Sequence, residues 1–239
     1  MRIAIVTGAS SGLGEEFVKQ ISKYSKIDEI WVIARRKEKL ENLKKILNKR
    51  IKVVALDLIL QDNIEKLKWL LSNDKPNIKL LVNCAGYGIR KSFIDGTYEE
   101  ELGMLDINCK SLTALTYICI PYMHKNSRII QIASAAAFLP QPDFAIYSAS
   151  KAYVLSFSRA LNKELRCRKI YVTAVCPGPV DTEFFRISDA GGIMPSYKRL
   201  FLAKADRVVQ KALRDSKRKK NISIYGISIQ LLRLLTRFL

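Results

Sequence analysis

Short runs of hydrophobic residues alternate with longer amphipathic stretches along most of the chain. The runs are apolar throughout, as in strands that are covered on both faces of a parallel sheet. The intervening stretches place apolar residues at helical spacing. This alternation predicts an α/β fold with a doubly wound parallel sheet of about seven strands and helices on both faces. The expected strands are residues 3–6, 30–34, 51–56, 78–82, 129–133, 169–176 and 222–225.

The amphipathic stretches predict the helices that connect these strands. Helical spacing follows a glycine-rich turn after the first strand and continues to about residue 24. The other expected helices are residues 37–48, residues 63–71, a short helix before a long one at about 105–122, and then residues 146–166, 206–214 and 227–239. No repeat or linker interrupts the pattern, so we expect a single domain over residues 1–239.

Two segments near the C-terminus depart from this alternation. Residues 183–205 contain aromatic residues and glycines with little periodicity, which after a strand favours a mobile substrate lid. Residues 221–239 predict a short strand and an amphipathic helix. That helix is open to three interpretations: an interfacial membrane helix, a lid over an apolar pocket, or a subunit contact.

The turn after the first strand reads Thr-Gly-Ala-Ser-Ser-Gly-Leu-Gly over residues 7–14. Such a turn lets the backbone approach a nucleotide pyrophosphate, and the following helix N-terminus supplies free N–H groups. A glycine cluster can also serve a tight turn alone, but the strand before it and the helix after it favour nucleotide binding. The candidate residues are Gly8, Ser10, Ser11, Gly12, Leu13 and Gly14.

Two arginines, Arg35 and Arg36, follow the second strand, and no carboxylate accompanies them. In a dinucleotide fold this strand end faces the adenosine ribose. An acidic residue there binds the 2′-hydroxyl of NAD, whereas an arginine accommodates the 2′-phosphate of NADP. Guanidinium pairs well with phosphate. The pattern therefore favours NADP(H), although these arginines could also simply begin the next helix on its solvent side.

Ligand-type residues follow other expected strands as well. Asp57 can accept a hydrogen bond from an adenine amino group, or it can cap the next helix. The fourth strand ends in Asn83-Cys-Ala-Gly86, whose small residues suggest a close backbone approach, and Pro177-Gly-Pro-Val-Asp-Thr182 breaks the sixth strand. Because ligands bind at the carboxyl ends of parallel strands, we expect these residues to share one site.

Ser134 follows the fifth strand, and Tyr147 and Lys151 lie four residues apart in the next helix. This spacing places both side chains on one helix face. A free phenol has a pKa of about 10, and a nearby ammonium lowers it. A hydroxyl, a phenol and an ammonium together predict a proton-transfer site, although Tyr-x-x-x-Lys alone occurs in many helices.

Composition narrows the functional classes. The formal net charge of +19 favours an anionic partner, such as a nucleotide phosphate, a nucleic acid or an anionic membrane surface, although scattered lysines more often form a solvated surface. The five cysteines include no Cys-x-x-Cys, which indicates neither a disulfide framework nor a zinc site and favours a reducing cytoplasm. A single histidine excludes a His-based triad or multi-His metal site. We expect no metal, signal peptide or membrane-spanning helix.

In combination, these motifs resemble the short-chain dehydrogenase/reductase family, from about residue 2 to residue 182. The matching motifs are residues 7–14, Asn83-Cys-Ala-Gly86, Ser134, Tyr147-x-x-x-Lys151 and Pro177-Gly178. Cys84 departs mildly from the usual Asn-Asn-Ala-Gly. Arg35-Arg36 resembles the NADP-preferring members. The resemblance implies a Rossmann-like fold.

The resemblance also implies roles for the site residues. Tyr147 would be the general acid in reduction and the general base in oxidation, Lys151 would lower its pKa and hold the nicotinamide ribose, and Ser134 would orient the reacting oxygen. Asn108 would hold a water in the proton relay, and Thr182 would bind the nicotinamide carboxamide. Further cofactor contacts are expected from Asp57, Leu58, Asn83, Ala85, Gly86, Pro177, Gly178 and Val180. Many members are dimers or tetramers built on two long helices, so we expect a homodimer or homotetramer.

The leading hypothesis is an NADP(H)-dependent oxidoreductase that acts on a ketone or secondary alcohol. The aromatic lid suggests a bulky apolar substrate of steroid, lipid or acyl type, with Phe184, Phe185 and Tyr87 as candidate contacts. The alternative is a non-catalytic NADP(H)-binding sensor on the same fold. Nucleic-acid binding is not expected, because no recognised motif is present. Peripheral membrane contact through the C-terminus could coexist with enzyme activity.

Overall fold

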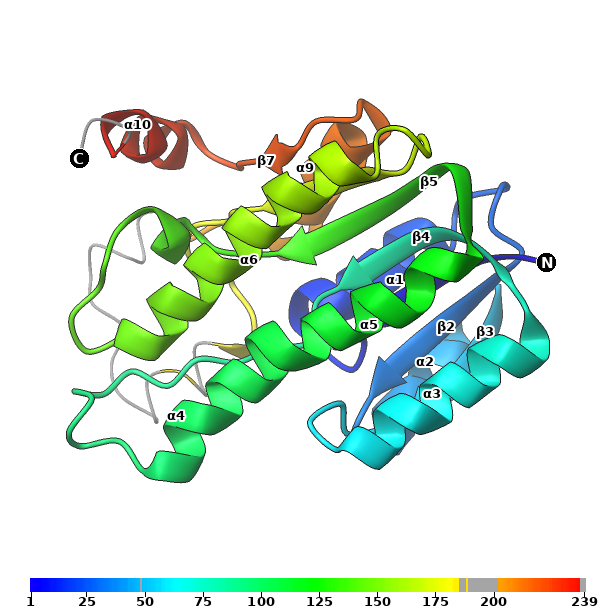
Figure 1. Cartoon of the computed structure of the whole chain (residues 1–239), viewed down its shortest axis with the longest axis horizontal. Helices are drawn as coiled ribbons and strands as arrows, with labels where there is room; N and C mark the ends of the chain where they lie inside the picture. The colour runs from blue at the N-terminus through cyan, green and yellow to red at the C-terminus, as the bar shows by residue number, and fades with distance from the viewer. Residues whose placement is uncertain (48, 185–187, 189–201, 237–239) are drawn as a thin grey trace.

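A seven-stranded parallel sheet forms the centre of the molecule, with the order β3-β2-β1-β4-β5-β6-β7. The computed structural model describes residues 1–47, 49–184, 188 and 202–236. The strand order confirms the expected doubly wound fold (Figure 1). The strands are β1 Arg2–Thr7, β2 Glu29–Ala34, β3 Arg50–Ala55, β4 Asn77–Asn83, β5 Met123–Ile132, β6 Tyr171–Val175 and β7 Ile222–Ser223.

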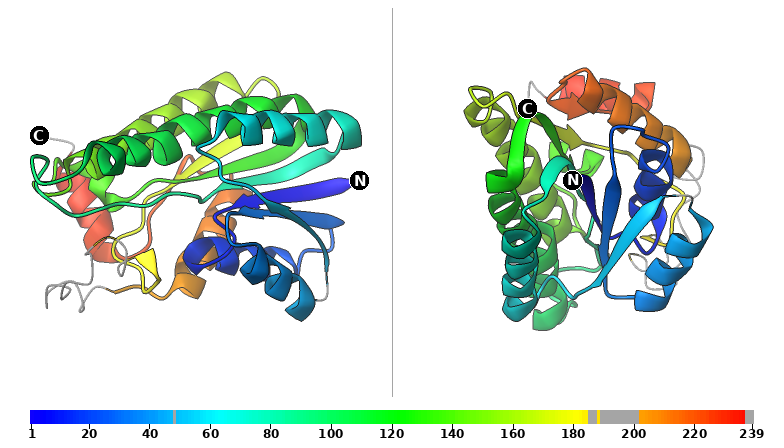
Figure 2. Two further views of the ribbon diagram at one scale, coloured as in Figure 1. Left: turned by 90° about the horizontal axis from the view of Figure 1, so that it is seen from below. Right: turned by 90° about the vertical axis from the view of Figure 1, so that its right-hand side faces the viewer.

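Helices cover both faces of this sheet (Figure 2). One apolar core joins one face of the sheet to α1, α2 and α9, and another joins the opposite face to α3, α5 and α6. The C-terminal α10 lies beyond β7, near the loop that precedes α6 (Figure 1). The α-helices are α1 Gly12–Ile21, α2 Lys37–Ile46, α3 Gln61–Asp74, α4 Tyr98–Leu105, α5 Leu112–Cys119, α6 Ala145–Glu164, α9 Ala205–Lys217 and α10 Ile227–Leu235.

The central strands are buried as their composition predicts. All residues of β1 after Arg2 are buried, and so is every residue of β2. Continuous burial is what a parallel strand experiences when helices lie on both faces of its sheet. The apolar runs therefore agree with interior positions of β1 and β2 in the sheet, and parallel pairing places their carboxyl ends at one edge.

Two elements differ from their expected form. The helix expected at about 105–122 is interrupted by the π-helical segment η1 (Asp106–Ser111), which lies between α4 and α5. Strand β5 begins at Met123 rather than at 129. Its first half is polar, so the hydrophobic pattern of the sequence does not reveal it. Ser127 is fully buried there and donates to the carbonyl of Ile78 at 2.7 Å.

A buried polar network joins β4, β5 and α5. The amide of Asn83 donates to Thr116 Oγ1 at 2.9 Å and to Gln131 Oε1 at 2.8 Å, and Gln131 Nε2 donates to Thr116 Oγ1 at 3.0 Å. All three side chains are at most 2% exposed. Buried polar groups are costly unless paired, so this network fixes how α5 sits on the sheet.

We expect Asn83→Ala to lower the free energy of unfolding by about 2–3 kcal/mol, because it leaves the buried Gln131 Oε1 without its hydrogen-bond donor and removes buried side-chain atoms. Urea denaturation followed by circular dichroism measures this change. The matched control is Asn73→Ala on the exposed side of α3, with an expected effect within about 0.5 kcal/mol. Equal stability of the two variants would contradict the structural role of Asn83.

Candidate active site

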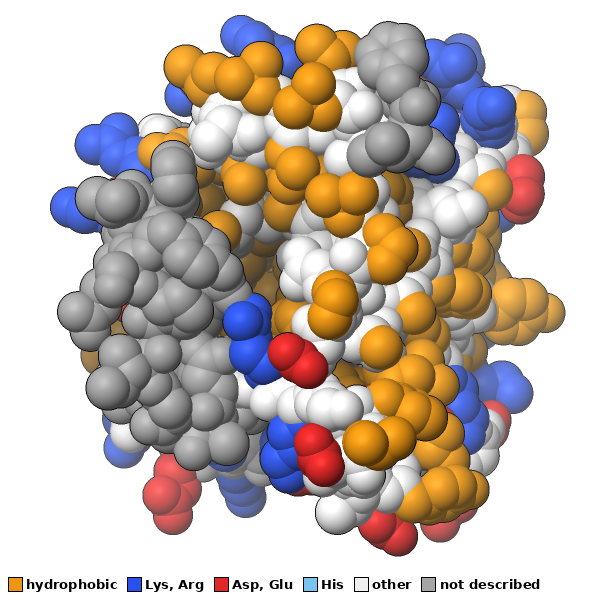
Figure 3. All heavy atoms as spheres, turned by 90° about the vertical axis from the view of Figure 1, so that its left-hand side faces the viewer, with side chains coloured by type: hydrophobic (Ala, Val, Ile, Leu, Met, Phe, Trp, Pro, Cys, Tyr) orange, Lys and Arg blue, Asp and Glu red, His pale blue; other side chains and the backbone are white. Residues whose placement is uncertain are grey.

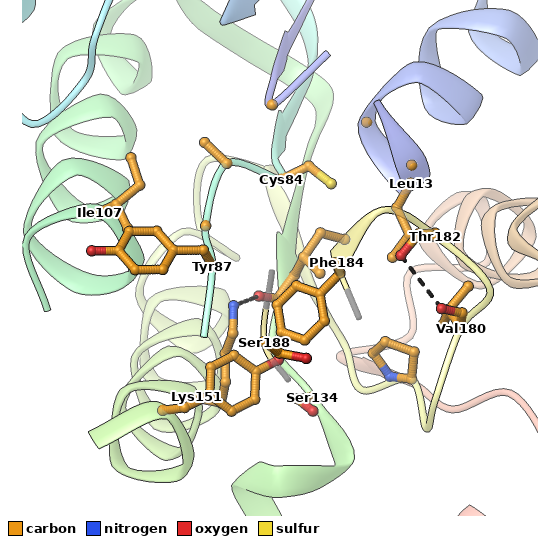
Figure 4. A pocket seen from close by; sticks show the side chains of 18 of the residues that line it. Leu13, Cys84, Tyr87, Ile107, Ser134, Lys151, Val180, Thr182, Phe184 and Ser188 are labelled. Atoms are coloured by element: carbon orange, nitrogen blue, oxygen red, sulfur yellow. Dashed lines mark hydrogen bonds between the residues drawn. The ribbon is translucent and has the colours of Figure 1, made fainter. Parts of the chain in front are cut away.

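A cavity of about 1080 Å³ opens at the carboxyl ends of the strands. Most of the residues singled out in the sequence line it, including the glycine-rich turn, the residues after β2, β3 and β4, and the residues after β5 and β6. Figure 4 shows several of these side chains facing the same space. The lining residues expected from sequence are Gly8, Ser10, Ser11, Gly12, Leu13, Gly14, Arg35, Arg36, Asp57, Leu58, Ala85, Gly86, Tyr87, Ser134, Tyr147, Lys151, Pro177, Gly178, Val180, Thr182 and Phe184.

The glycine-rich turn forms a cradle that has no room for side chains. Gly8 has a φ of 65°, and a Cβ there would come within 2.9 Å of the backbone of Cys84 and Ala85. A Cβ on Gly14 would overlap the carbonyl of Gly8. Helix α1 starts next to this turn, and no side chain caps its N-terminus. Free amides beside a close-packed backbone suit a pyrophosphate, so the residues present fit a dinucleotide.

Basic side chains lie at the end of the cavity that the glycine-rich turn and the residues after β2 and β3 form. Arg36 donates from Nε to Ser10 Oγ at 3.1 Å and from Nη2 to the Ser10 carbonyl at 3.2 Å. The Arg35 side chain is 71% exposed, and its Nη1 lies 4.0 Å from Asp57 Oδ2. Asp57 also accepts a hydrogen bond from the amide of Ile59 at 3.1 Å, which supports a turn-capping role while it lines the cavity. The arginines therefore border the cavity and do not merely begin α2 on its solvent side.

Ser134, just after β5, and Tyr147 and Lys151, both in α6, line the other end of the cavity, and Figure 4 labels Ser134 and Lys151 there. Ser134 Oγ accepts a hydrogen bond from the amide of Ala136 at 3.1 Å, and its hydroxyl acts to lower the pKa of the Tyr147 phenol. Lys151 Nζ donates to the carbonyl of Ile132 at 2.9 Å. The i, i+4 spacing and the strand end thus bring these three groups together as the sequence predicts.

Burial controls the protonation of this pair. It raises the pKa of Tyr147 to about 12, and the hydrogen bond from Ser134 opposes this only in part. Burial also lowers the pKa of Lys151 to about 8. The sequence suggested that the Lys151 ammonium lowers the pKa of Tyr147. In this structure desolvation outweighs that effect, because Lys151 Nζ points to Ile132 and lies 5.5 Å from the Tyr147 ring centroid.

Aromatic side chains hold the Tyr147 ring in place. Phe144 stacks on it at a centroid distance of 4.2 Å, and Phe184 lies at 5.5 Å. A Cβ on Gly88 would come within 2.5 Å of Tyr147 Cδ2, so the backbone closes the remaining side. The phenol is therefore positioned by packing on several sides.

Asn83 and Asn108 are not among the cavity-lining residues. The Asn83 side chain belongs to the buried network under the sheet edge. Asn108 is fully buried in η1, where its Oδ1 accepts from the Tyr87 amide at 3.2 Å and its Nδ2 donates to the Tyr87 carbonyl at 2.9 Å and to Ser150 Oγ at 3.1 Å. These bonds engage both ends of the amide. Its side chain therefore fixes the Tyr87 segment and α6 rather than reaching the cavity.

The expected substrate contacts have different outcomes. Phe184 lines the cavity and packs on Tyr147. Tyr87 lines it as well, although its ring extends toward Ile107 and its hydroxyl lies close to Gly103 of α4 (Figure 4). Phe185 lies outside the described residues, as does most of the lid expected at 183–205. The described end of that segment returns to the site, since Ala203 pairs with Val180.

Sequence reasoning missed several apolar lining residues. Phe144, which precedes Tyr147, and Ile89, which follows the Asn-Cys-Ala-Gly motif, both line the cavity. Neither belongs to a motif or carries a polar group that would single it out in the sequence. Helix α10 contributes Ser228, Ile229 and Leu232, which supports the pocket-lid interpretation of the C-terminal helix. The amphipathic spacing of α10 predicts that one face of this helix is covered, but periodicity does not identify the surface or pocket that this face contacts.

The outer face of α10 carries a second apolar stripe. Ile227, Leu231, Leu234 and Leu235 are each at least 52% exposed. Figure 3 faces the side of the molecule where α10 lies in Figure 1, and hydrophobic side chains gather there with Lys and Arg at the edges. Among the described residues, no helix is long and apolar enough to cross a membrane. The membrane-surface and subunit-contact interpretations of this stripe both stay hypotheses.

We expect Lys151→Met to stabilise the ligand-free protein by about 2 kcal/mol at pH 7. Burial lowers the pKa of Lys151 from 10.5 to about 8, so the fold penalises its charged form by about 3 kcal/mol, and the variant loses one hydrogen bond worth about 1 kcal/mol. The penalty is complete below the folded-state pKa and disappears as pH rises past the unfolded-state value. The gain should therefore shrink between pH 8 and 10.5.

Urea denaturation across this pH range measures the effect. Lys163→Met, on the exposed side of the same helix, is the matched control and should show no such pH-dependent gain. A Lys151→Met protein that is less stable than wild type at pH 7 would show that burial does not strain this ammonium.

Comparison with known proteins agrees with the geometry of the site. The sequence model of the family described as short chain dehydrogenase matches residues 2–190. An uncharacterised oxidoreductase of Staphylococcus epidermidis is 32% identical over 192 residues, which cover 80% of this chain and 83% of the relative. A very-long-chain 3-oxoacyl-CoA reductase of Rattus norvegicus is 32% identical over 197 residues, which cover 77% of this chain and 61% of the relative.

Solved structures show the same fold. A short-chain dehydrogenase from Sphingobium yanoikuyae in complex with NADPH superimposes with a TM-score of 0.84 at 24% identity, over 100% of this chain and 94% of the other. A serine dehydrogenase complexed with NADP⁺ gives a TM-score of 0.82 at 27% identity, over 93% of each chain. The chain belongs to the short-chain dehydrogenase/reductase family and is an NAD(P)-dependent oxidoreductase of the class that interconverts C=O and CH–OH groups.

Proposed function

We propose that this oxidoreductase uses NADP(H) and reduces a bulky apolar ketone, or oxidises the corresponding secondary alcohol. The observation that carries the proposal is the arrangement of the cavity. Buried Tyr147, Lys151 and Ser134 lie at one end among apolar walls, and Arg35 and Arg36 lie at the other. A bound nicotinamide dinucleotide would supply the hydride.

Tyr147 is suited to donate a proton to the carbonyl oxygen of the substrate. Its phenol is neutral at pH 7, since burial raises its pKa to about 12. Ser134 Oγ lines the cavity with this phenol and can hold the reacting oxygen beside it. Lys151 Nζ lines the same cavity at 5.5 Å from the Tyr147 ring centroid, where it can hold a ribose hydroxyl and stabilise the phenolate that proton transfer leaves behind.

The substrate class is inferred from the walls near Tyr147. Ile89, Phe144, Phe184, Ile229 and Leu232 line the cavity, so a large apolar group would be desolvated there. The similarity to a very-long-chain 3-oxoacyl-CoA reductase supports an acyl-type ketone as one member of this class. Small polar substrates would leave these walls without contacts.

The preference for NADP(H) is inferred from the basic residues after β2. No acidic residue occupies positions 34–36, and the exposed Arg35 guanidinium borders the cavity. Arginine recognises phosphate through planar, charge-assisted hydrogen bonds. The similarity to a serine dehydrogenase complexed with NADP⁺ supports the same preference.

A non-catalytic sensor of NADP(H) is the alternative on this fold. A sensor needs the phosphate cradle and the arginines, but it does not need a phenol held between two aromatic rings beside Ser134 and Lys151. The packing around Tyr147 therefore favours catalysis.

We expect wild-type protein to oxidise NADPH much faster than NADH with at least one member of a panel of steroid, acyl and aromatic ketones. Tyr147→Phe should lower turnover by about a thousandfold or more, because it removes the proton donor, while the Kd for NADPH stays within about twofold. Nicotinamide absorbance measures turnover, and calorimetry measures binding. Tyr153→Phe, an exposed position of α6, is the control. Normal turnover by Tyr147→Phe would exclude the proposed role.

We expect Arg35→Ala to weaken NADPH binding by about tenfold and to leave the Kd for NADH nearly unchanged. One charge-assisted contact to a 2′-phosphate is worth about 1.4 kcal/mol when partly exposed to solvent. Arg166→Ala, outside the cavity, makes the same change in net charge and serves as control. Equal weakening of both cofactors by Arg35→Ala would contradict phosphate recognition.

A further inference from the structure

The Glu183 carboxylate bridges two basic side chains at the adenosine end of the cavity. Its Oε2 lies 2.9 Å from Arg36 Nη1, and its Oε1 lies 2.8 Å from Lys39 Nζ. These two hydrogen-bonded cations lower the pKa of Glu183 to about 2, so the group is an anion throughout the neutral range. Glu183 and Arg36 both line the cavity.

This carboxylate occupies an environment that suits a phosphate. Arg36 is the N-cap residue of α2, and Lys39 lies in the first turn of that helix, where no side chain caps the N-terminus. The positive end of the helix dipole adds to the two cations. Arg36 is also held against Ser10 of the glycine-rich turn, so the bridge lies next to the expected dinucleotide cradle.

From this arrangement we propose that Glu183 is an internal competitor for the 2′-phosphate of NADP(H), and that binding of this phosphate displaces it from Arg36 and Lys39. The inference rests on the proposed use of NADP(H). A phosphate monoester carries a charge of about −1.5 to −2 at neutral pH and has three acceptor oxygens, whereas Glu183 offers one charge and two oxygens. The phosphate therefore has the advantage in both charge and acceptor number, whereas the adenosine ribose of NAD(H) carries only uncharged hydroxyl groups at this position.

The neighbours of Glu183 connect this exchange to the catalytic end. Thr182 packs over the glycine-rich turn, since a Cβ on Gly12 would come within 3.2 Å of Thr182 Cβ. Phe184 packs on Tyr147 at a ring-centroid distance of 5.5 Å. A move of Glu183 thus acts on a segment that contacts both the phosphate cradle and the reacting phenol.

The test compares Glu183→Gln with Asp181→Asn by measuring Kd for NADPH and NADH calorimetrically at fixed pH and salt. Asp181 lies in the same segment and is exposed, and it is not part of the cavity wall. Both substitutions remove one negative charge. We expect Glu183→Gln to bind NADPH about threefold to tenfold more tightly than wild type, because partly exposed ion pairs are individually weak. Its Kd for NADH, and both Kd values of Asp181→Asn, should stay within about twofold of wild type.

Three outcomes for the two variants would overturn this inference alone. Unchanged or weaker NADPH binding by Glu183→Gln would mean that the carboxylate does not compete. Weaker binding of both cofactors would assign Glu183 a supporting role. An equal gain in Asp181→Asn would reduce the effect to net charge. A wild-type protein that binds NADH as tightly as NADPH, or binds neither, would instead overturn the proposed cofactor and the inference with it.

Discussion

The site depends on the desolvation of a tyrosine and a lysine at the carboxyl edge of a parallel sheet. Burial raises the pKa of Tyr147 to about 12 and lowers that of Lys151 to about 8. In both residues the protein favours the uncharged form more than water does. Helix α6, the end of β5 and the aromatic side chains around Tyr147 impose this environment. A neutral phenol beside Ser134 is the state that a proton donor requires in carbonyl reduction.

The other end of the same cavity differs from the region around Tyr147, because backbone amides and arginine side chains line it. There the wall includes polar groups, namely the amides of the glycine-rich turn and the side chains of Arg35 and Arg36. Residues 182–184 contact both regions, through Gly12, Arg36 and Tyr147 respectively. Three consecutive residues therefore connect the two ends of the cavity.

Much of the fold and part of the site could be predicted from the sequence, because hydrophobic periodicity reports burial and strand ends converge at one edge. The same reasoning could not say where Asn83 and Asn108 point, since a motif gives residue type and not side-chain direction. The start of β5 could not be predicted, because polar residues such as Ser127 do not look like a buried strand. Ser127 is buried there since its hydroxyl donates to the carbonyl of Ile78, a contact that the sequence pattern does not show. The effect of burial on Tyr147 and the bridge made by Glu183 depend on contacts between distant segments, which only the folded chain shows.

The desolvation of Tyr147 is tested most directly by its ionisation, followed as the ultraviolet difference between wild type and Tyr147→Phe across alkaline pH, without and with NADP⁺. The phenol of the ligand-free protein should stay protonated up to a pKa of about 12. NADP⁺, whose nicotinamide is positively charged, should shift the ionisation to lower pH. Ionisation of ligand-free Tyr147 near the ordinary value of 10, unaffected by NADP⁺, would contradict this desolvation.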